Sequence, residues 1–460
     1  GLCLFGIRGR MGYNPIKVSQ AYYCEDPFLN QLGVNPVFNL LTSTLDDNRK
    51  ENRTLHLMSE EDALSKVQKY LHRQGIDRLS PIARKVEREG TPNRRNVVLV
   101  FMESMSANLM GTFGSDKKLT PYLDSLYQQS LSFSHFYSSG IHTNHGIYST
   151  LYSFPAIMKR NAMKGSVIPV YSGLPTVLQE NGYCNLFFMT HESQYDNMNA
   201  FLRTNGFDEI YAQENYPSEK VVNSFGVQDD FMYQYALPIL NERAGTGNPF
   251  FSVLLSISNH PPYVIPPYFH PHSDVLEEQI VEYADWSIRQ FMQAAEKQPW
   301  FDNTIFVFLG DHGKMVGTPE CEMPQSYNHI PLMIYGKDIK PGVYDGFGGQ
   351  VDVSPTLLGL LNISYLQNNF GVNLLEEERP CMFFTADNLI GARDSVNMFI
   401  YSPDSQQEFK YKLEEGKLHA ATGTDEEAFR NLKDYCFSML QSTESLVKEH
   451  KTLDKVSVKK

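Results

Sequence analysis

The stretch Val97-Val98-Leu99-Val100-Phe101-Met102-Glu103-Ser104 places six apolar residues directly before a carboxylate and a hydroxyl. A short uninterrupted apolar run is typical of a strand that is buried on both faces, as in a parallel sheet. A second run, Ile305-Phe306-Val307-Phe308-Leu309, leads in the same way into Gly310-Asp311-His312-Gly313. Ligands of open α/β sheets bind beyond the carboxyl ends of the strands. The two stretches therefore predict a parallel sheet with polar site residues along one edge.

Apolar runs of the same kind recur along the middle of the chain, at residues 185–189, 250–257 and 331–335. Amphipathic segments that favour helices lie between them, and residues 122–129, which follow the start signal Thr120-Pro121, are one example. This alternation predicts an α/β fold, with a mostly parallel central sheet that is flanked by helices.

The two ends of the chain differ from this middle part. After about residue 380, alternating segments and a final helix at 425–448 indicate a smaller antiparallel-sheet subdomain. The first 90 residues are polar and poor in long apolar runs. We therefore expect an N-terminal arm over residues 1–92, a main domain over 93–379 and an α+β subdomain over 380–460.

Composition excludes several classes of protein. The 460 residues carry a net charge of −13, which argues against a protein that binds the phosphate backbone of nucleic acids. Six scattered cysteines without a C-x-x-C motif argue against a zinc ribbon or a dense disulfide framework. No window approaches the roughly 18 to 20 apolar residues of a membrane span. The apolar opening at residues 1–7 fits either a buried strand or a position just after a removed hydrophobic segment.

The polar residues at the predicted strand ends have the chemistry of a metal site. Carboxylates and neutral histidine are ligands for divalent cations of the zinc or manganese type. Glu103 alone could equally cap a helix or a turn, whereas the Asp311-His312 pair between two glycines is more specific. Thr143 precedes a segment that favours a helix, where a hydroxyl can attack a phosphate or sulfate, although it could also serve only as a helix cap.

The types and order of these residues resemble the alkaline phosphatase/sulfatase superfamily. Glu103 follows the first strand, a hydroxyl residue comes forty positions later at a helix start, and Asp311-His312-Gly313 lies late in the chain. Residues 119–126, 328–335 and 352–357 extend the resemblance.

The run Thr143-Asn144-His145-Gly146-Ile147 separates the branches of this superfamily. It lacks the cysteine and the arginine of the sulfatase C-x-P-x-R motif, so sulfate-ester hydrolysis by that mechanism is not expected. A threonine in this place is similar to the lipoteichoic acid synthases and the phosphoethanolamine transferases. Arg8-Gly9 and Asn35-Pro36 also resemble the segment that joins the membrane helices of lipoteichoic acid synthases to their extracellular domain.

The resemblance implies a set of site residues. Glu103, Thr143, Asp311 and His312 would bind one divalent metal, manganese first, with zinc or magnesium as alternatives. Thr143 would attack the phosphodiester of a membrane phospholipid and hold the head group as a phosphothreonine. His260 is the candidate for the acid and base steps. His191 would contact the substrate, with Asp196 or Arg203 in place of side chains that the family has and this chain lacks, and His329 would be a phosphate contact or a structural residue.

The resemblance therefore implies transfer of a phosphoglycerol-type head group from a membrane phospholipid to a glycan or polyol-phosphate acceptor. The alternatives are a phosphoethanolamine transferase, a phosphodiesterase or phosphatase, and a binding module without turnover. It also implies a catalytic domain outside the cell membrane, extracellular or periplasmic, and anchored through N-terminal helices that are missing here. Nucleic acid is not expected as a partner.

Overall fold

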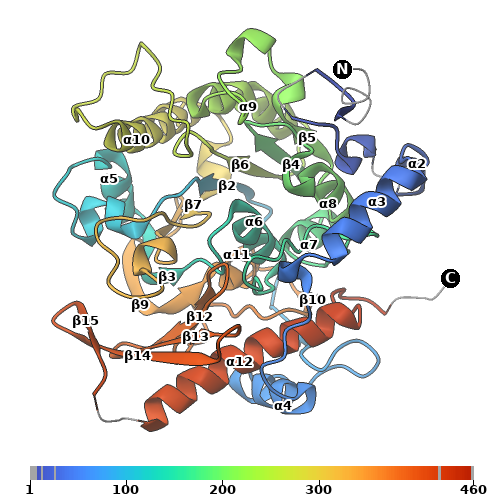
Figure 1. Cartoon of the computed structure of the whole chain (residues 1–460). Coiled ribbons are helices and arrows are strands. Elements are labelled where there is room, and N and C mark those ends of the chain that lie inside the picture. The colour runs from blue at the N-terminus through green and yellow to red at the C-terminus, as the bar shows by residue number, and fades with distance from the viewer. Residues whose placement is uncertain (1–7, 12–13, 25–26, 423–425, 457–460) are drawn as a thin grey trace.

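A central sheet of eight strands organises the computed structural model, which describes residues 8–11, 14–24, 27–422 and 426–456 (Figure 1). In spatial order these strands are β5 (Glu209–Tyr211), β4 (Cys184–Met189), β6 (Phe250–Leu255), β2 (Asn96–Met102), β7 (Thr304–Gly310), β8 (Leu332–Tyr335), β3 (Leu131–Tyr137) and β9 (Gly342–Gly349). Only β8 runs against its neighbours among these described strands, because it pairs antiparallel with both β7 and β3. The predicted α/β fold with a mostly parallel sheet is confirmed.

Helices cover both faces of this sheet. On one face lie α5 (Pro121–Gln129), α9 (Asp229–Ala244) and α10 (Leu276–Ala295), and on the other α6 (Thr143–Tyr152), α7 (Leu174–Glu180), α8 (Met198–Thr204) and α11 (Val353–Leu360). Alternate side chains of β2 enter the two cores, so that Leu99 joins the core under α6 while Val100 joins the core under α9. Burial on both sides explains why β2 reads as an uninterrupted apolar run.

A separate antiparallel sheet follows near the C-terminus, as predicted. It consists of β11 (Met382–Thr385), β12 (Ile390–Arg393), β13 (Asn397–Ser402), β14 (Gln407–Glu414) and β15 (Lys417–Ala420), with α12 (Glu426–Lys448) packed across it. Phe399 and Leu432 of this part belong to the same apolar core as Leu99 of the central sheet. The C-terminal part is therefore packed onto the main domain without a gap in the core.

The N-terminal region lies against two different parts of the molecule. The helices α2 (Pro27–Leu32) and α3 (Pro36–Asp47) lie near α8, whereas α4 (Glu60–Tyr70) packs against α12 (Figure 1). Further along, β1 (Arg84–Val86) pairs with β10 (Tyr365–Gln367). Asn199 of α8 donates hydrogen bonds to the backbone carbonyls of Ser19 and Tyr22, which ties the segment before α2 to the main domain.

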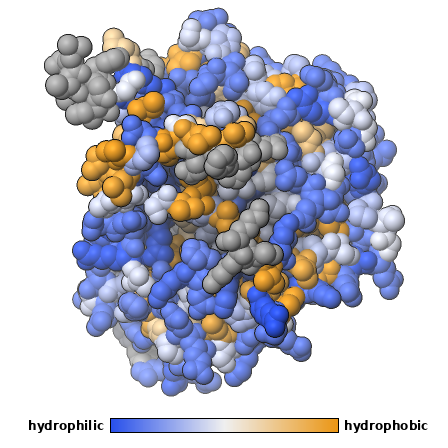
Figure 2. Space-filling view, turned by 90° about the vertical axis from the view of Figure 1, so that its right-hand side faces the viewer, coloured by the Kyte–Doolittle hydropathy of each residue, from blue (hydrophilic) through white to orange (hydrophobic). Residues whose placement is uncertain are grey.

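No helix within the described ranges is both long and apolar enough to cross a lipid bilayer. The apolar opening at residues 1–7 lies outside the described residues. Apolar side chains do gather on one face of the molecule, around α2 and α3, as Figure 2 shows.

Candidate active site

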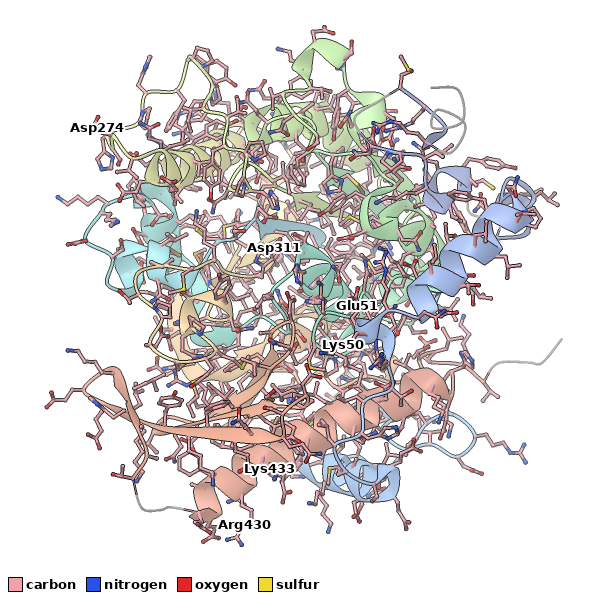
Figure 3. The ribbon with its side chains drawn as sticks, in the orientation of Figure 1. Lys50, Glu51, Asp274, Asp311, Arg430 and Lys433 are labelled. Carbon is pink, nitrogen blue, oxygen red and sulfur yellow. The ribbon has the colours of Figure 1, made fainter. Side chains whose placement is uncertain are left out.

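The ends of β2 and β7 bring two carboxylates and an imidazole together. These strands are parallel neighbours, with Met102 opposite Gly310, so the next residues Glu103 and Asp311 lie side by side. His312 Nε2 lies 3.5 Å from Glu103 Oε1 and 3.5 Å from Asp311 Oδ2. One ligand atom from each of these three residues lies within 4.8 Å of the others. Figure 3 labels Asp311 in the middle of the molecule.

Thr143 joins this cluster from the first turn of α6. Its hydroxyl oxygen lies 3.1 Å from Glu103 Oε2 and 2.8 Å from Asp311 Oδ2. Gly146, one turn later, permits this approach, because a Cβ there would lie 2.3 Å from the carbonyl oxygen of Asp311. The structure thus brings together Glu103, Thr143, Asp311 and His312, with the hydroxyl at the positive end of a helix.

The charges in this cluster are strongly coupled. Burial disfavours the ionised form of Glu103, but the hydrogen bond and charge of His312 outweigh it and lower the pKa of Glu103 to about 2. Burial, followed by the negative charge of Glu103, raises the pKa of Asp311 to about 8. Although burial opposes a charge on His312, the two carboxylates raise its pKa to about 10. Without a cation, Asp311 and His312 therefore hold their protons more strongly than usual. A bound cation would supply the positive charge that these protons now provide.

The donor set fits a divalent metal ion. Two carboxylates, an imidazole nitrogen and a hydroxyl oxygen are the oxygen and nitrogen donors that such ions take. His312 Nδ1 lies 2.7 Å from the carbonyl oxygen of Gly313, which directs Nε2 to the cluster. Ser104 also orients the carboxylates, because its hydroxyl donates to Glu103 at 2.7 Å and its backbone N–H donates to Asp311 at 2.9 Å. These contacts support a metal site formed by residues of this chain.

The buried polar atoms that have no hydrogen-bond partner among the described residues include His191 Nε2, Asn144 Oδ1 and, two residues after Thr143, His145 Nδ1. His191 follows β4, and its Nδ1 lies 2.9 Å from the carbonyl oxygen of Glu192. Asn144 follows Thr143 directly, and its amide nitrogen lies 3.4 Å from Asp196 Oδ2. Buried polar atoms usually have a partner, so His191 Nε2 and Asn144 Oδ1 are free to contact a polar ligand beside Thr143.

His260 lies beside this region, in a row of rings. Its ring centroid is 4.2 Å from that of Phe225, which in turn lies 6.0 Å from Tyr195, and Tyr195 lies 4.7 Å from His191. The preceding residue, Asn259, is the one that contacts the cluster, because its amide donates to the backbone carbonyl of Glu103 at 3.1 Å. The structure gives no direct contact between His260 and the four clustered residues.

His329 is half-buried among aromatic rings, and the structure does not bring its ring to the cluster. The ring centroid is 5.2 Å from that of Phe113 and 5.3 Å from that of Tyr137. Nε2 lies 2.8 Å from the carbonyl oxygen of Ser134, and burial lowers the pKa of His329 to about 4. Its contacts are those of a packed neutral histidine, and a phosphate contact by His329 stays a prediction.

Sequence reasoning missed two further polar groups at this site. Lys314 Nζ lies 2.6 Å from Asn259 Oδ1, and burial lowers the pKa of Lys314 to about 8. Asp387, from the loop between β11 and β12, lies 2.6 Å from Nε2 of His142, the residue before Thr143. Lys314 could have been predicted as a site residue, because it stands only two residues after His312. Nothing in the sequence connects Asp387 with His142, which lie 245 residues apart.

Known proteins share this chain's sequence pattern and fold. A sulfatase family model matches residues 95–363. The "lipoteichoic acid synthase-like YvgJ" of Bacillus subtilis is 25% identical over 362 residues, which are 71% of this chain and 56% of that protein. The chain spans about half the length of the curated relatives it matches.

Two solved structures share the fold. An alkaline phosphatase superfamily protein from Vibrio parahaemolyticus has a TM-score of 0.78 at 24% identity, over 88% of this chain and 99% of that one. The lipoteichoic acid synthase LtaP from Listeria monocytogenes has a TM-score of 0.64 at 20% identity, over 84% of this chain and 98% of that one. Because the family model covers more than half of the chain, the chain belongs to the sulfatase family of the alkaline phosphatase superfamily, and within it the chain is similar to the lipoteichoic acid synthases.

Proposed function

We propose that this chain is a metal-dependent phosphotransferase that moves a phosphoglycerol-type head group from a membrane phospholipid to a hydroxyl of a glycan or polyol-phosphate polymer. The observation that carries the proposal is the Thr143 hydroxyl, 2.8 Å from Asp311 and 3.1 Å from Glu103 at the start of α6. A threonine here, without the cysteine and arginine of the sulfatase motif, favours phosphate over sulfate esters. The relatives named as lipoteichoic acid synthases support the head group and a place outside the cell membrane.

Glu103, Asp311, His312 and Thr143 would hold the metal ion, with manganese proposed first and zinc or magnesium as alternatives. When bound, such an ion lowers the pKa of a coordinated hydroxyl and stabilises negative charge on phosphoryl oxygens. Thr143 Oγ1 then forms a bond to phosphorus while the bond between phosphorus and the diacylglycerol oxygen breaks. The acceptor hydroxyl next attacks the phosphothreonine, and Thr143 is restored.

These two steps need a group that gives a proton to the leaving diacylglycerol oxygen and one that takes a proton from the acceptor. We keep His260 as the candidate, because Nδ1 lies 2.6 Å from the carbonyl oxygen of Pro261, which leaves Nε2 for proton exchange. His191 Nε2, which has no partner among the described residues, is proposed to contact the phosphate of the head group, with Asp196 beside it.

Intact-mass measurement tests this proposal. The protein is incubated with Mn²⁺ and either phosphatidylglycerol or phosphatidylethanolamine, without an acceptor. We expect the mass of one phosphoglycerol group to appear on Thr143 with phosphatidylglycerol, and no adduct on the Thr143→Ala variant. An adduct that persists in Thr143→Ala would refute the nucleophile, and a phosphoethanolamine adduct would reassign the head group.

Transfer and hydrolysis differ in the fate of the phosphothreonine. Added glycerol or a glycan acceptor should divert the head group from free glycerol phosphate to an acceptor ester. If acceptors leave the product unchanged, the chain is a phosphodiesterase that gives the same intermediate to water.

A further inference from the structure

A cavity of about 720 Å³ lies between the N-terminal arm and the main domain. Its walls come from the segment 16–52, from α6 and the loop that follows it, and from the loop at 194–197. The volume is within the range of sites that hold small organic ligands. Figure 2 views the face that carries α3, where apolar side chains surround this part of the molecule.

The helix α3 presents several polar side chains to this cavity. Asn39, Thr42 and Ser43 line the cavity, whereas Val37 and Leu41 on the same helix are 67% and 60% exposed. A surface helix normally turns its apolar stripe inward, because that face then escapes water. Phe38 and Leu45 of α3 also line the cavity, so the helix side of this space is mixed, and its hydroxyl and amide groups suit a ligand with a polar group.

The opposite wall of the cavity contains an apolar patch. Tyr148, Ile157 and Tyr171 line it and belong to the buried core, and Ile168 packs against that core. A ligand that fills the cavity would therefore contact hydroxyl and amide groups on one side and aromatic and aliphatic groups on the other. This combination fits an amphiphile, a molecule with both a polar and an apolar part.

Two lysines in the cavity wall favour a ligand that carries a negative charge. Within the described part of the chain, neither Lys17 nor Lys164 has an ion pair or a side-chain hydrogen bond, although Lys17 Nζ lies 5.8 Å from the Tyr195 ring centroid. Partial burial, together with the nearby positive charge of Lys164, lowers the pKa of Lys17, although the negative charges of Asp196, Glu192 and Asp46 oppose this shift.

Of the other charged groups in the wall, both arginines are paired with carboxylates, whereas Asp47 has no ion pair among the described residues. Arg160 pairs with Glu444 at 2.9 Å, and Arg49 lies 3.3 Å from Asp46 and 3.8 Å from Glu51. Two like charges that face one cavity repel each other, so an anion between them would be favourable.

The cavity shares a wall with the candidate active site. The backbone N–H of Lys17 donates to Gln194 at 2.7 Å, and Tyr195, under the Lys17 ammonium, lies against the ring of His191. Asp196 in the same loop contacts Asn144, the neighbour of Thr143. A ligand in the cavity would therefore contact the loop at 194–197, which lies beside the candidate active site. None of the four clustered residues lines the cavity, so the ligand would not touch them directly.

We infer that this cavity is a second ligand site, which binds an anionic amphiphile with its phosphate or carboxylate group between Lys17 and Lys164 and its apolar part on Tyr148, Ile157 and Tyr171. The inference does not depend on the proposed transfer reaction, because it concerns binding at residues that take no part in that chemistry.

Calorimetric titration with three probes below their micelle concentrations tests the site. Dodecyl phosphate has both the anion and the chain, inorganic phosphate has only the anion, and dodecyl maltoside has the same chain with an uncharged sugar head group. The protein carries Thr143→Ala and is treated with EDTA, so that the metal cluster does not bind the phosphate. We expect dodecyl phosphate to bind most tightly; equal or tighter binding of either other probe, or no binding of dodecyl phosphate, would overturn the inference.

Lysine variants locate the binding. In the same background, Lys17→Gln with Lys164→Gln should weaken dodecyl phosphate binding about tenfold, which corresponds to two partly exposed ion pairs. Lys159→Gln, which removes an exposed lysine outside the cavity lining, is the matched control and should leave the affinity unchanged. Thermal unfolding checks that all variants fold. An unchanged affinity in the double variant would refute the site.

Discussion

The contact between α6 and the end of β7 makes Gly146→Ala a sharp test of the candidate site. A Cβ on Gly146 would lie 2.3 Å from the carbonyl oxygen of Asp311 and 2.9 Å from its carbonyl carbon. Carbon and oxygen atoms in ordinary contact are about 3.5 Å apart, so the helix must move away by about 1 Å. Because Thr143 lies one turn earlier, its 2.8 Å contact with Asp311 would lengthen beyond hydrogen-bond range.

This displacement should affect catalysis more than stability. Overpacking costs about 1 to 3 kcal/mol, and the higher helix propensity of alanine offsets up to about 1 kcal/mol of that cost. A misplacement of about 1 Å in a catalytic group lowers the rate about 100-fold. We therefore expect a folded variant whose rate of diacylglycerol release from phosphatidylglycerol falls about 100-fold.

The matched control is Gly342→Ala, since no atom lies within 4 Å of a Cβ at that position and its backbone is not in the left-handed region. This variant should retain the wild-type rate and melting temperature. Diacylglycerol release and thermal unfolding are measured on all three proteins. If Gly146→Ala is folded and releases diacylglycerol at more than half the wild-type rate, the close packing of α6 on Asp311 does not position Thr143.

Three further predictions concern the metal, a buried ion pair and pH. EDTA should abolish head-group release and Mn²⁺ should restore it, as measured by diacylglycerol formation; full activity after chelation would contradict the metal site. Arg379→Met should destabilise the fold by about 3 to 5 kcal/mol in urea unfolding, because it leaves Asp352 buried and unpaired, whereas Arg88→Met removes a partly exposed pair and should cost about 0 to 1 kcal/mol. Burial raises the pKa of Asp285 to about 7, so its contribution to stability is complete below about pH 4 and is lost as the pH rises to about 7. Between about pH 4 and pH 7, the urea midpoint of the wild type should therefore fall more than that of Asp285→Asn. Equal falls in the two proteins would refute this prediction.

The strands and the clustering of Glu103, Asp311 and His312 were predictable because each depends on a local pattern. β2 and β7 are buried on both faces, so they read as continuous apolar runs, and Glu103 and Asp311 mark the points where those runs end. Parallel neighbours place their carboxyl ends at one edge, which brings the two residues together from distant parts of the chain. The direction of β8 was not predictable, because an apolar run is the same when it is read in either direction.

The directions of side chains in loops could not be predicted from the sequence either. Asn259 and His260 are adjacent, and the sequence favoured the histidine because of its chemistry, but the asparagine is the residue that contacts Glu103. The contact of Asp387 with His142 depends on how the C-terminal subdomain packs on the main domain, which no local pattern encodes. The orientation of α3, which leaves Val37 and Leu41 exposed, likewise depends on packing that no local pattern encodes.

The net charge of −13 and an anionic substrate are compatible because the two act over different distances. Charges on the exposed surface are screened over roughly 8 Å at physiological ionic strength, so they contribute little at a buried cluster. A nucleic acid would need many cationic contacts across a wide surface to release its counterions. A single phosphodiester needs only one local positive charge, and the donor set of Glu103, Asp311 and His312 fits the cation that would provide it. The acidic composition therefore excludes extended polyanions while it permits chemistry on one phosphate group.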